Sequence, residues 1–322
     1  MYTTRALNSL SRRYICAQCR HFSSSKPTLA QAAEVKKLGV IGAGQMGLGI
    51  ALTASRMAKV PVTVVDNSQQ SLDKGMSFAD KLLAKDVQKE KISQSDSDST
   101  RQRLQTTTKM DDLGDMDMVI EAVPEIIELK KSIFSSLAQI CPPHAILATN
   151  TSSISITLIA AATTKDPKDL SASSRVVSTH FMNPVPVQKG VEIISGLQTS
   201  AETLATAIAF CEKMGKITST SADSPGFLAN RILMPYINEA IICLETGVGD
   251  AKSIDDIMKN GTNVPMGPLT LADFIGLDTC LSIMEVLHAG LGDSKYRPAV
   301  RLRQMVDAGW LGKKSRKGFY EY

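Results

Sequence analysis

Four histidines are the side chains in this 322-residue chain best suited to move a proton near neutral pH. His180 closes an apolar run and opens the polar sequence His-Phe-Met-Asn-Pro. Of the others, His21 lies in a basic head, His144 in a Pro-Pro-His turn and His288 in an expected helix. A general base works best when its pKa lies near the working pH. By position, His180 is therefore the candidate base for removing a hydroxyl proton, as the oxidation of an alcohol requires.

Further polar side chains lie where apolar runs end. Glu192 stands inside the run Val191–Ile194, where a charge is costly unless it is paired. It could hold the imidazole of His180 and stabilise the imidazolium, but a separation of twelve residues does not prove contact. Residues 121–125 and 150–153, Glu-Ala-Val-Pro-Glu and Asn-Thr-Ser-Ser, also follow apolar runs. Open parallel sheets bind ligands at such strand ends.

A glycine-rich turn follows the first apolar run. Leu38–Ile41 leads into Gly42-Ala43-Gly44-Gln45-Met46-Gly47, and a helix is expected over 46–56. Gly42 permits the tight turn, Gly44 allows the backbone to approach a pyrophosphate, and Gly47 allows the helix to pack closely on the sheet. Free amide hydrogens at the start of such a helix bind phosphate. In this context the motif predicts a dinucleotide site far more specifically than it does alone.

Asp66 ends the next apolar run, nineteen residues after Gly47. An acid at this point accepts hydrogen bonds from both hydroxyls of the adenosine ribose. Its charge repels a 2′-phosphate, and the following Asn67 and Ser68 provide no arginine to bind one. The sequence therefore predicts NAD rather than NADP as the cofactor.

The apolar runs that position these residues predict a mainly parallel sheet, because short runs separated by helix-length segments are typical of crossover connections. We expect strands at Leu38–Ile41, Val62–Val65, Met118–Ile120, Ile146–Thr149, Val176–Thr179, Val191–Ile194 and, with a weaker pattern, Ile217–Ser221. The charged, lysine-rich segment 71–109 is expected to form a helical hairpin that projects from the sheet.

Strand patterns stop at residues 223–226, Asp-Ser-Pro-Gly, and Pro-Gly is typical of a break in the chain. Helices are expected over 227–246, 254–260, 269–289 and 299–308. The predicted fold is α/β, with a Rossmann-type NAD-binding domain over residues 34–223 and an all-helical domain over residues 224–322.

The basic charge is confined to the start of the chain. Residues 1–33 hold five basic side chains and no acid; without them, 31 basic residues stand against 32 acidic ones, so nucleic-acid binding has no support. An Arg-rich, acid-poor, serine-rich start is typical of a mitochondrial transit peptide, with a disordered tail as the alternative. We expect cleavage near Ser23 and a location in the mitochondrial matrix. No run approaches the roughly 20 apolar residues that cross a bilayer, so no membrane partner is expected.

The six cysteines indicate neither a disulfide framework nor a metal site. Cys16 and Cys19 have the spacing of a metal pair, but no second pair completes a zinc site. The other four are isolated among apolar residues, as buried thiols usually are: Cys141, Cys211, Cys243 and Cys280.

Several motifs together resemble the L-3-hydroxyacyl-CoA dehydrogenase family, most closely its short-chain 3-hydroxybutyryl-CoA branch. They occur in the family's order over about residues 36–322: Gly42–Ala51, Glu121–Glu125, Asn150–Ser153, His180–Pro186, Ser224–Arg231, Pro265–Pro268, Gly276–Asp278 and Gly312–Tyr320. The resemblance implies reversible, NAD-dependent oxidation of a short- or medium-chain (S)-3-hydroxyacyl-CoA to the 3-oxoacyl-CoA, as in fatty acid β-oxidation. It also implies that the helical domain, whose apolar stripes are broad, contributes to substrate binding and forms a homodimer.

The family's roles fall on matching positions of this sequence. His180 resembles the general base and Glu192 the acid that orients it. Ser152 resembles the hydroxyl that binds the reacting oxygen beside the nicotinamide, and Asn230 the amide that positions the substrate. Four further residues match positions that contact NAD in the family: Glu125, Lys130, Asn183 and Lys314. The alternative for each of them is an ordinary surface or helix-capping residue.

The lysine-rich hairpin matches the region that holds coenzyme A in the family. Lys81, Lys85 and Lys89 recur on one helix face, where mobile cations suit phosphates, although a plain solvated face explains them nearly as well. Of the three, Lys89 is the candidate contact. Gly190 stands where the family more often has a bulkier apolar residue, so the sequence leaves the chain-length preference open.

Other functions fit the same architecture. A dehydrogenase for a free sugar acid such as gulonate, or for another hydroxy acid, would not need the lysine hairpin. A related enzyme with a lysine base is disfavoured by the sequence His-Phe-Met-Asn-Pro at 180–184. A dinucleotide-binding protein without turnover is disfavoured by the complete set Ser152, His180, Glu192 and Asn230.

Overall fold

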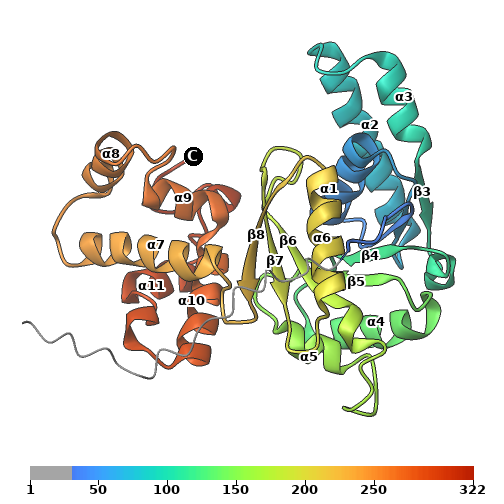
Figure 1. The fold of residues 1–322 in the computed structure, drawn as a ribbon. Coiled ribbons are helices and arrows are strands. Elements are labelled where there is room, and N and C mark those ends of the chain that lie inside the picture. The colour runs from blue at the N-terminus through green and yellow to red at the C-terminus, as the bar shows by residue number, and fades with distance from the viewer. Residues whose placement is uncertain (1–30) are drawn as a thin grey trace, which may run out of the picture. The chain divides into compact units, whose positions relative to one another are not determined.

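The computed structural model describes residues 31–322, which form a sheet region followed by a helical region. The strands of the sheet region lie in the order β3-β2-β1-β4-β5-β6-β7-β8 (Figure 1). Their bounds are β1 Leu38–Ile41, β2 Val62–Val65, β3 Leu104–Thr107, β4 Met118–Glu121, β5 Ile146–Thr149, β6 Val176–Phe181, β7 Gly190–Ser195 and β8 Ile217–Ala222. All neighbouring strands are parallel except β6 and β7, which are antiparallel. The predicted α/β fold with a mainly parallel sheet is confirmed.

Helices cover both faces of the sheet (Figure 1). One face is covered by α1 (Gln45–Thr53), α2 (Gln69–Gln88) and α6 (Ala201–Lys213). The other face is covered by α4 (Ile127–Ile140) and α5 (Ile156–Ala161). Successive strand residues alternate between the two cores, since Val40 belongs to the first hydrophobic cluster and Ile41 to the second. Burial on both faces explains why the central strands are unbroken apolar runs in the sequence.

The order of the strands reverses beside β1. From β1 the chain runs outward to β2 and β3, and it then returns to β4 on the other side of β1. The carboxyl ends of these parallel strands share one edge of the sheet. The crevice between β1 and β4 at that edge is where open sheets of this kind bind their ligands.

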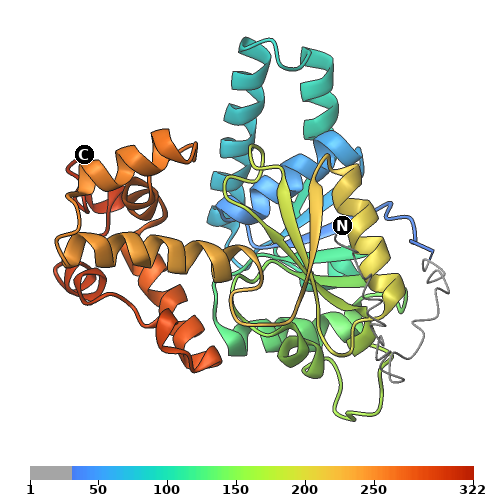
Figure 2. The same ribbon diagram turned by 60° about the vertical axis from the view of Figure 1, so that its left-hand side comes forward.

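The expected hairpin over 71–109 ends in a strand that the sequence did not predict. Helix α2 and helix α3 (Gln94–Gln102) form the hairpin, which Figure 2 shows from the side. Leu104–Thr107 then pairs in parallel with β2 as the edge strand β3. Only Leu104 of its four residues is buried, so no apolar run marks the strand.

The helical region surrounds its own hydrophobic cluster, which includes Met234, Leu269 and Leu287. The helices are α7 Ala229–Glu245, α8 Ala251–Gly261, α9 Pro268–Ile275, α10 Leu277–Leu291 and α11 Val300–Asp307. The single helix expected over 269–289 is two helices that meet at 98°. Gly276 separates them because its φ of +104° is not helical.

Two kinds of feature are absent from the part of the chain that the structure describes. Over residues 31–322 no single helix is both long enough and apolar enough to cross a membrane. Among these residues only α9 and α10 taken together, which are bent by 98°, have that length and composition. Within the same residues, no three histidine, cysteine or acidic side chains are grouped as metal ligands.

Candidate active site

The antiparallel pairing of β6 and β7 places His180 directly opposite Glu192. The imidazole Nδ1 lies 2.8 Å from Glu192 Oε2, and both side chains are buried. An ionised carboxylate only accepts hydrogen bonds, so Nδ1 carries the proton and donates it. In the neutral form of the imidazole, Nε2 then carries the lone pair that can accept a proton. His180 and Glu192 are therefore in contact in the structure, which their spacing in the sequence could not prove.

The Nε2 side of the imidazole faces the loop that follows β5. Ser152 Oγ lies 3.0 Å from His180 Nε2, and Asn230 Nδ2 donates to the backbone carbonyl of Ser152 across 3.4 Å. Ser152, His180 and Glu192 therefore form one hydrogen-bonded chain, with Asn230 beside its Ser152 end. A hydroxyl and a base that converge in this way can bind a substrate hydroxyl and remove its proton.

Glu192 also connects the sheet to the first helix of the helical region. Its Oε1 accepts hydrogen bonds from the backbone amides of Leu228 at 2.8 Å and Ala229 at 2.9 Å, at the start of α7. Burial raises the pKa of the Glu192 carboxyl, but the hydrogen bonds from His180 and the two amides lower it below its usual value overall. The carboxylate therefore stays ionised beside the imidazole at neutral pH.

Glu125 holds the loop that carries Ser152. Its Oε1 accepts hydrogen bonds from the Thr151 hydroxyl at 2.5 Å and from the backbone amides of Ser152 and Ser153 at 3.0 and 3.1 Å. Lys130 Nζ lies 3.3 Å from its other oxygen. Burial raises the pKa of Glu125, but the charge of Lys130 and these hydrogen bonds lower it overall. Glu125 is therefore built to orient the Ser152 loop.

Acid is expected to destabilise this loop in a definite pH window. A carboxyl whose pKa is lower in the folded than in the unfolded protein adds stability above the unfolded value, and that stability is lost as the pH falls through the folded value. For Glu125 the loss begins near its ordinary pKa of 4.5 and extends downward. In urea unfolding, lowering the pH below 4.5 should therefore reduce the free energy of unfolding less in Glu125→Gln than in the parent protein. The exposed Glu128 provides the control, since Glu128→Gln should retain the parent's acid dependence; an equal dependence for both variants would contradict the prediction.

Lys130 is buried in an ion pair with Glu121. Its Nζ donates to Glu121 Oε1 at 2.7 Å, and the relative exposures of the two residues are 1% and 0%. The hydroxyl of Thr149 donates to the second Glu121 oxygen at 2.7 Å. A direct contact of Lys130 with NAD was predicted, but the structure directs its ammonium group beneath the loop 121–125. In this position the lysine supports the loop from below.

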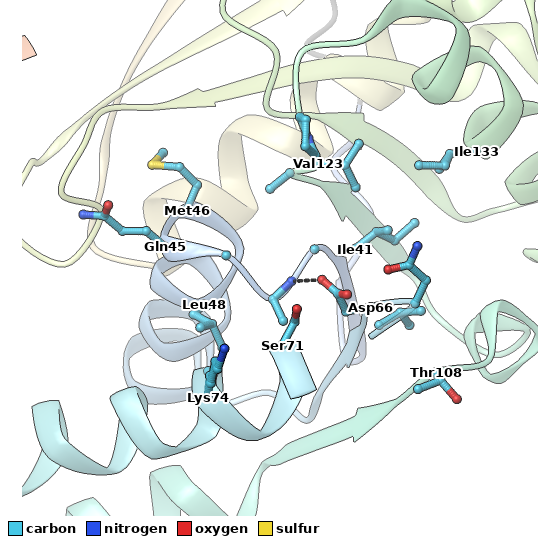
Figure 3. A pocket seen from close by; sticks show the side chains of 18 of the residues that line it. Ile41, Gln45, Met46, Leu48, Asp66, Ser71, Lys74, Thr108, Val123 and Ile133 are labelled. Atoms are coloured by element: carbon cyan, nitrogen blue, oxygen red, sulfur yellow. Dashed lines mark hydrogen bonds between the residues drawn. The ribbon is translucent and has the colours of Figure 1, made fainter. Parts of the chain in front are cut away.

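The glycine turn lines a cavity of about 1210 Å³ at the carboxyl edge of the sheet (Figure 3). This volume exceeds the roughly 300–1,000 Å³ of ordinary small-molecule pockets. Gly42 has a φ of +106°, and a Cβ on Gly47 would lie 2.0 Å from the Gly42 carbonyl oxygen. A Cβ on Gly44, by contrast, would meet no atom within 4 Å. The open space at Gly44, in front of the first amides of α1, fits the pyrophosphate of a dinucleotide.

Asp66 lies in this cavity at the end of β2. Its Oδ2 accepts a hydrogen bond from the Ala43 amide at 2.9 Å, drawn as the dashed line in Figure 3, and Oδ1 accepts one from the Ser68 amide at 3.0 Å. Each carboxylate oxygen keeps a further lone pair for a ribose hydroxyl. The position predicted from the sequence is therefore compatible with both contacts.

The Asp66→Ala variant is expected to bind NAD roughly 10- to 100-fold more weakly, because hydrogen bonds to a charged group contribute about 1.5–3 kcal/mol. The preference for NAD over NADP should fall as well, since the charge that repels a 2′-phosphate is lost. Calorimetric titration with both dinucleotides measures the two effects. Asp73→Ala on the exposed side of α2 is the control, and an unchanged NAD affinity of Asp66→Ala would remove Asp66 from the site.

A second cavity of about 520 Å³ lies beside the hairpin. Lys85 lines it from the last turn of α2, and Lys89 directly after that helix. Arg56 lines it from the π-helical turn Ala54–Ala58 that follows α1, and Pro184–Lys189 from the loop between β6 and β7. Cationic side chains beside apolar ones suit a ligand with both anionic and apolar parts. The structure thus places Lys89 where an extended anionic ligand can reach it.

The two remaining predicted NAD contacts lie in different places. Asn183 Oδ1 accepts a hydrogen bond from Gln45 Nε2 at 3.2 Å, which joins the end of β6 to the glycine turn. Lys314 instead forms an ion pair of 2.5 Å with Asp278 in the helical region. Within residues 31–322, no recorded hydrogen bond or ion pair joins Lys314 to the other predicted NAD contacts.

Several residues that line the glycine-turn cavity were not predicted. Ser71, Lys74 and Phe78 come from one face of α2, and Thr108 follows β3. The spacing of the first three is helical, so a helix beginning directly after Asp66 signals them in the sequence. Thr108 carries no such signal because its strand has no apolar run.

The chain is similar to known proteins over about 90% of its length. The model of the 3-hydroxyacyl-CoA dehydrogenase NAD-binding domain matches residues 37–223, and that of the C-terminal domain matches residues 226–322. A probable 3-hydroxybutyryl-CoA dehydrogenase of Bacillus subtilis is 51% identical over 289 residues, covering 90% of this chain and 98% of its own. The 3-hydroxybutyryl-CoA dehydrogenase of Bradyrhizobium diazoefficiens is 49% identical over 291 residues, with 90% and 97% covered. The crystal structure of (S)-3-hydroxybutyryl-CoA dehydrogenase from Ralstonia eutropha matches with a TM-score of 0.85 and 44% identity, over 90% of this chain and 99% of that one.

A cavity that suits a dinucleotide, linked through the loop 121–125 to a hydrogen-bonded serine and imidazole, is typical of an NAD-dependent dehydrogenase that acts on a hydroxyl group. The chain belongs to the 3-hydroxyacyl-CoA dehydrogenase family. The predicted family, enzyme class, NAD cofactor and oxidation of a 3-hydroxyacyl-CoA are thereby confirmed.

The predicted location in the mitochondrial matrix is wrong. The relatives that share about half of this sequence are bacterial proteins, from Bacillus subtilis, Deinococcus radiodurans and Bradyrhizobium diazoefficiens, and bacteria have no mitochondria. The composition of the head suggested a transit peptide, but residues 1–30 lie outside the described residues.

Proposed function

We propose that this chain interconverts short-chain (S)-3-hydroxyacyl-CoA and 3-oxoacyl-CoA, with 3-hydroxybutyryl-CoA, the substrate in the names of its relatives, as the preferred substrate. The observation that carries the proposal is the hydrogen-bonded chain of Ser152, His180 and Glu192 beside the dinucleotide cavity. The loop 121–125 connects the two, since Val123 lines the cavity and Glu125 binds the Ser152 amide.

Each of the four polar side chains has a distinct part in the proposed reaction. NAD, when bound, accepts the hydride that leaves C3 of the substrate. His180 Nε2 takes up the hydroxyl proton, and Glu192 stabilises the imidazolium that forms. Ser152 donates a hydrogen bond to the reacting oxygen, and Asn230 positions the substrate from the start of α7. In the reverse direction the imidazolium returns its proton to that oxygen.

We assign NAD to the glycine-turn cavity and coenzyme A to the second one. The turn 42–47 would hold the pyrophosphate and Asp66 the adenosine ribose. Asn183, which accepts a hydrogen bond from Gln45 after the glycine turn, would also contact the cofactor. Glu125 keeps its assignment as a contact of NAD, which rests on the family motif, and Lys130 supports the loop between cofactor and substrate. Lys89 binds a phosphate of coenzyme A. For Lys314 the assignment to NAD rests on the family motif alone.

The two regions have separate roles in this proposal. Residues 34–223 bind NAD, and residues 224–322 contribute to substrate binding and form the interface of a homodimer. The helical region exposes large apolar side chains that a second copy would cover: Ile232, Val248, Ile257 and Phe274. Light scattering should therefore give twice the mass of one chain. A monomer mass at working concentration would exclude the dimer.

The direct test of the function is NADH consumption with 3-oxoacyl-CoA substrates of increasing chain length. We expect the highest kcat/KM with acetoacetyl-CoA and a steady fall as the acyl chain lengthens. Gulonate with NAD is the comparison substrate. Turnover of gulonate without turnover of acetoacetyl-CoA would indicate the alternative, a sugar-acid or hydroxy-acid dehydrogenase of the same architecture.

A further inference from the structure

The turn before α7 brings an aromatic ring against the imidazole. Phe227 is buried, with 3% of its surface exposed, and its ring centroid lies 5.9 Å from that of His180. The two rings meet edge to face, at an interplanar angle of 63°. Contacts of this geometry are attractive and depend on direction. The imidazole is thus held by Ser152 at Nε2, by Glu192 at Nδ1 and by Phe227 at its side.

The backbone at Phe227 adopts an unfavourable conformation. Gly226 has a φ of +76° and Phe227 a φ of +49°, and the Phe227 amide donates to the Ser224 carbonyl at 2.9 Å. This is the pattern of a type II turn with glycine at its second central position. Glycine adopts a positive φ freely, whereas a bulky aromatic residue rarely does. Such a residue persists only where its surroundings require it.

The requirement lies in the acid–base pair. Directly after Phe227, the amides of Leu228 and Ala229 donate to Glu192 Oε1. An ordinary backbone conformation at residue 227 would redirect these amides and move the ring. One turn therefore contacts both members of the pair, with its ring on the imidazole and its amides on the carboxylate.

We propose that Phe227 is a positioning residue that fixes the His180 imidazole for proton transfer. This proposal rests on the proposed role of His180 as general base. Rotation of the imidazole would carry Nε2 away from Ser152, and the Phe227 ring opposes that rotation from the side. A displacement of about 1 Å at a reacting group lowers a rate by as much as roughly 10²-fold.

Two variants and one matched control separate positioning from packing. Phe227→Leu and Phe227→Met keep an apolar side chain but remove the ring. We expect kcat to fall roughly tenfold while the affinity for NAD stays unchanged. Phe134 is fully buried in the same hydrophobic cluster. Phe134→Leu should lower the melting temperature comparably and leave kcat unchanged.

A mutant cycle with His180→Gln completes the test. If Phe227 acts through the imidazole, the Phe227→Leu change has no further effect on kcat in the His180→Gln background. The proposal is overturned if Phe227→Leu behaves like Phe134→Leu, or if its loss persists in that background. If the leucine variant does not fold, Phe227→Met is used in the same cycle. Near-normal turnover of His180→Gln alone would instead refute the proposed function, so the two failures are distinguishable.

Discussion

The His180→Gln variant is expected to turn over roughly 10²–10⁴ times more slowly than the parent enzyme, the usual contribution of a general base. Glutamine can keep a hydrogen bond to Glu192, which lies 2.8 Å from the imidazole, but it has no group basic enough to take up the substrate proton. The affinity for NAD should not change, because His180 does not line the glycine-turn cavity. Steady-state kinetics with (S)-3-hydroxybutyryl-CoA and an independent NAD titration measure the two quantities.

His144 provides the matched control for this substitution. It is an exposed histidine that also contacts a carboxylate, with Nε2 lying 3.2 Å from Asp117 Oδ1. His144→Gln should therefore retain the parent's kcat. Near-normal turnover of His180→Gln, or an equal loss in both variants, would exclude His180 as the base.

Lys130→Met is expected to lower the free energy of unfolding by about 3–5 kcal/mol, the typical cost of removing one partner from a buried ion pair. Methionine matches the length of the lysine stem, so the loss comes from the charge. The carboxylate of Glu121 has no exposed surface, and without the ammonium group at 2.7 Å it remains buried with an uncompensated charge. Its hydrogen bonds from the Thr149 hydroxyl and the Val123 amide only partly compensate. Urea unfolding gives the change directly.

The neighbouring lysine is the control for this prediction. Lys131 forms an ion pair of 2.9 Å with Glu128, but that pair is exposed to solvent. Lys131→Met should cost at most about 1 kcal/mol, because exposed pairs are weak. A similar cost for the two substitutions would show that the burial of Lys130 does not determine its effect. The affinity of Lys130→Met for NAD should also fall, because the loop 121–125 loses its support.

The positions of most strands and the mainly parallel character of the sheet were predictable because most strands are buried on both faces. Their apolar runs are continuous, and the predicted bounds of β1, β2 and β5 agree with the structure. β3 escaped prediction because three of its four residues are not buried. The break between α9 and α10 escaped for a different reason: the apolar pattern continues across Gly276, and only its backbone conformation separates the helices.

The candidate site was predictable in its residues but not in its contacts. Position at a strand end identified His180, and the cost of a buried charge identified Glu192. Their contact depends on the antiparallel register of β6 and β7, which a mainly parallel pattern does not indicate. For Lys130 the sequence could not distinguish a ligand contact from a buried ion pair. Phe227 lies in the motif Ser224–Arg231, but neither its positive φ nor its contact with the imidazole can be read from the residue type.

Among the lysines of residues 31–322, Lys130 and Lys216 differ from the others because they are buried. Lys130 has a relative exposure of 1% and Lys216 one of 8%, and the Lys216 ammonium donates to the carbonyls of Val185 and Gln188. An amine-reactive reagent in water can therefore modify either lysine only after the surrounding structure opens locally. Modification of Lys130 would record opening of the layer beneath the Ser152 loop, whereas modification of Lys216 would record release of the loop between β6 and β7. The native protein thus contains two separate reporters of its own local unfolding, readable by mass spectrometry without any substitution.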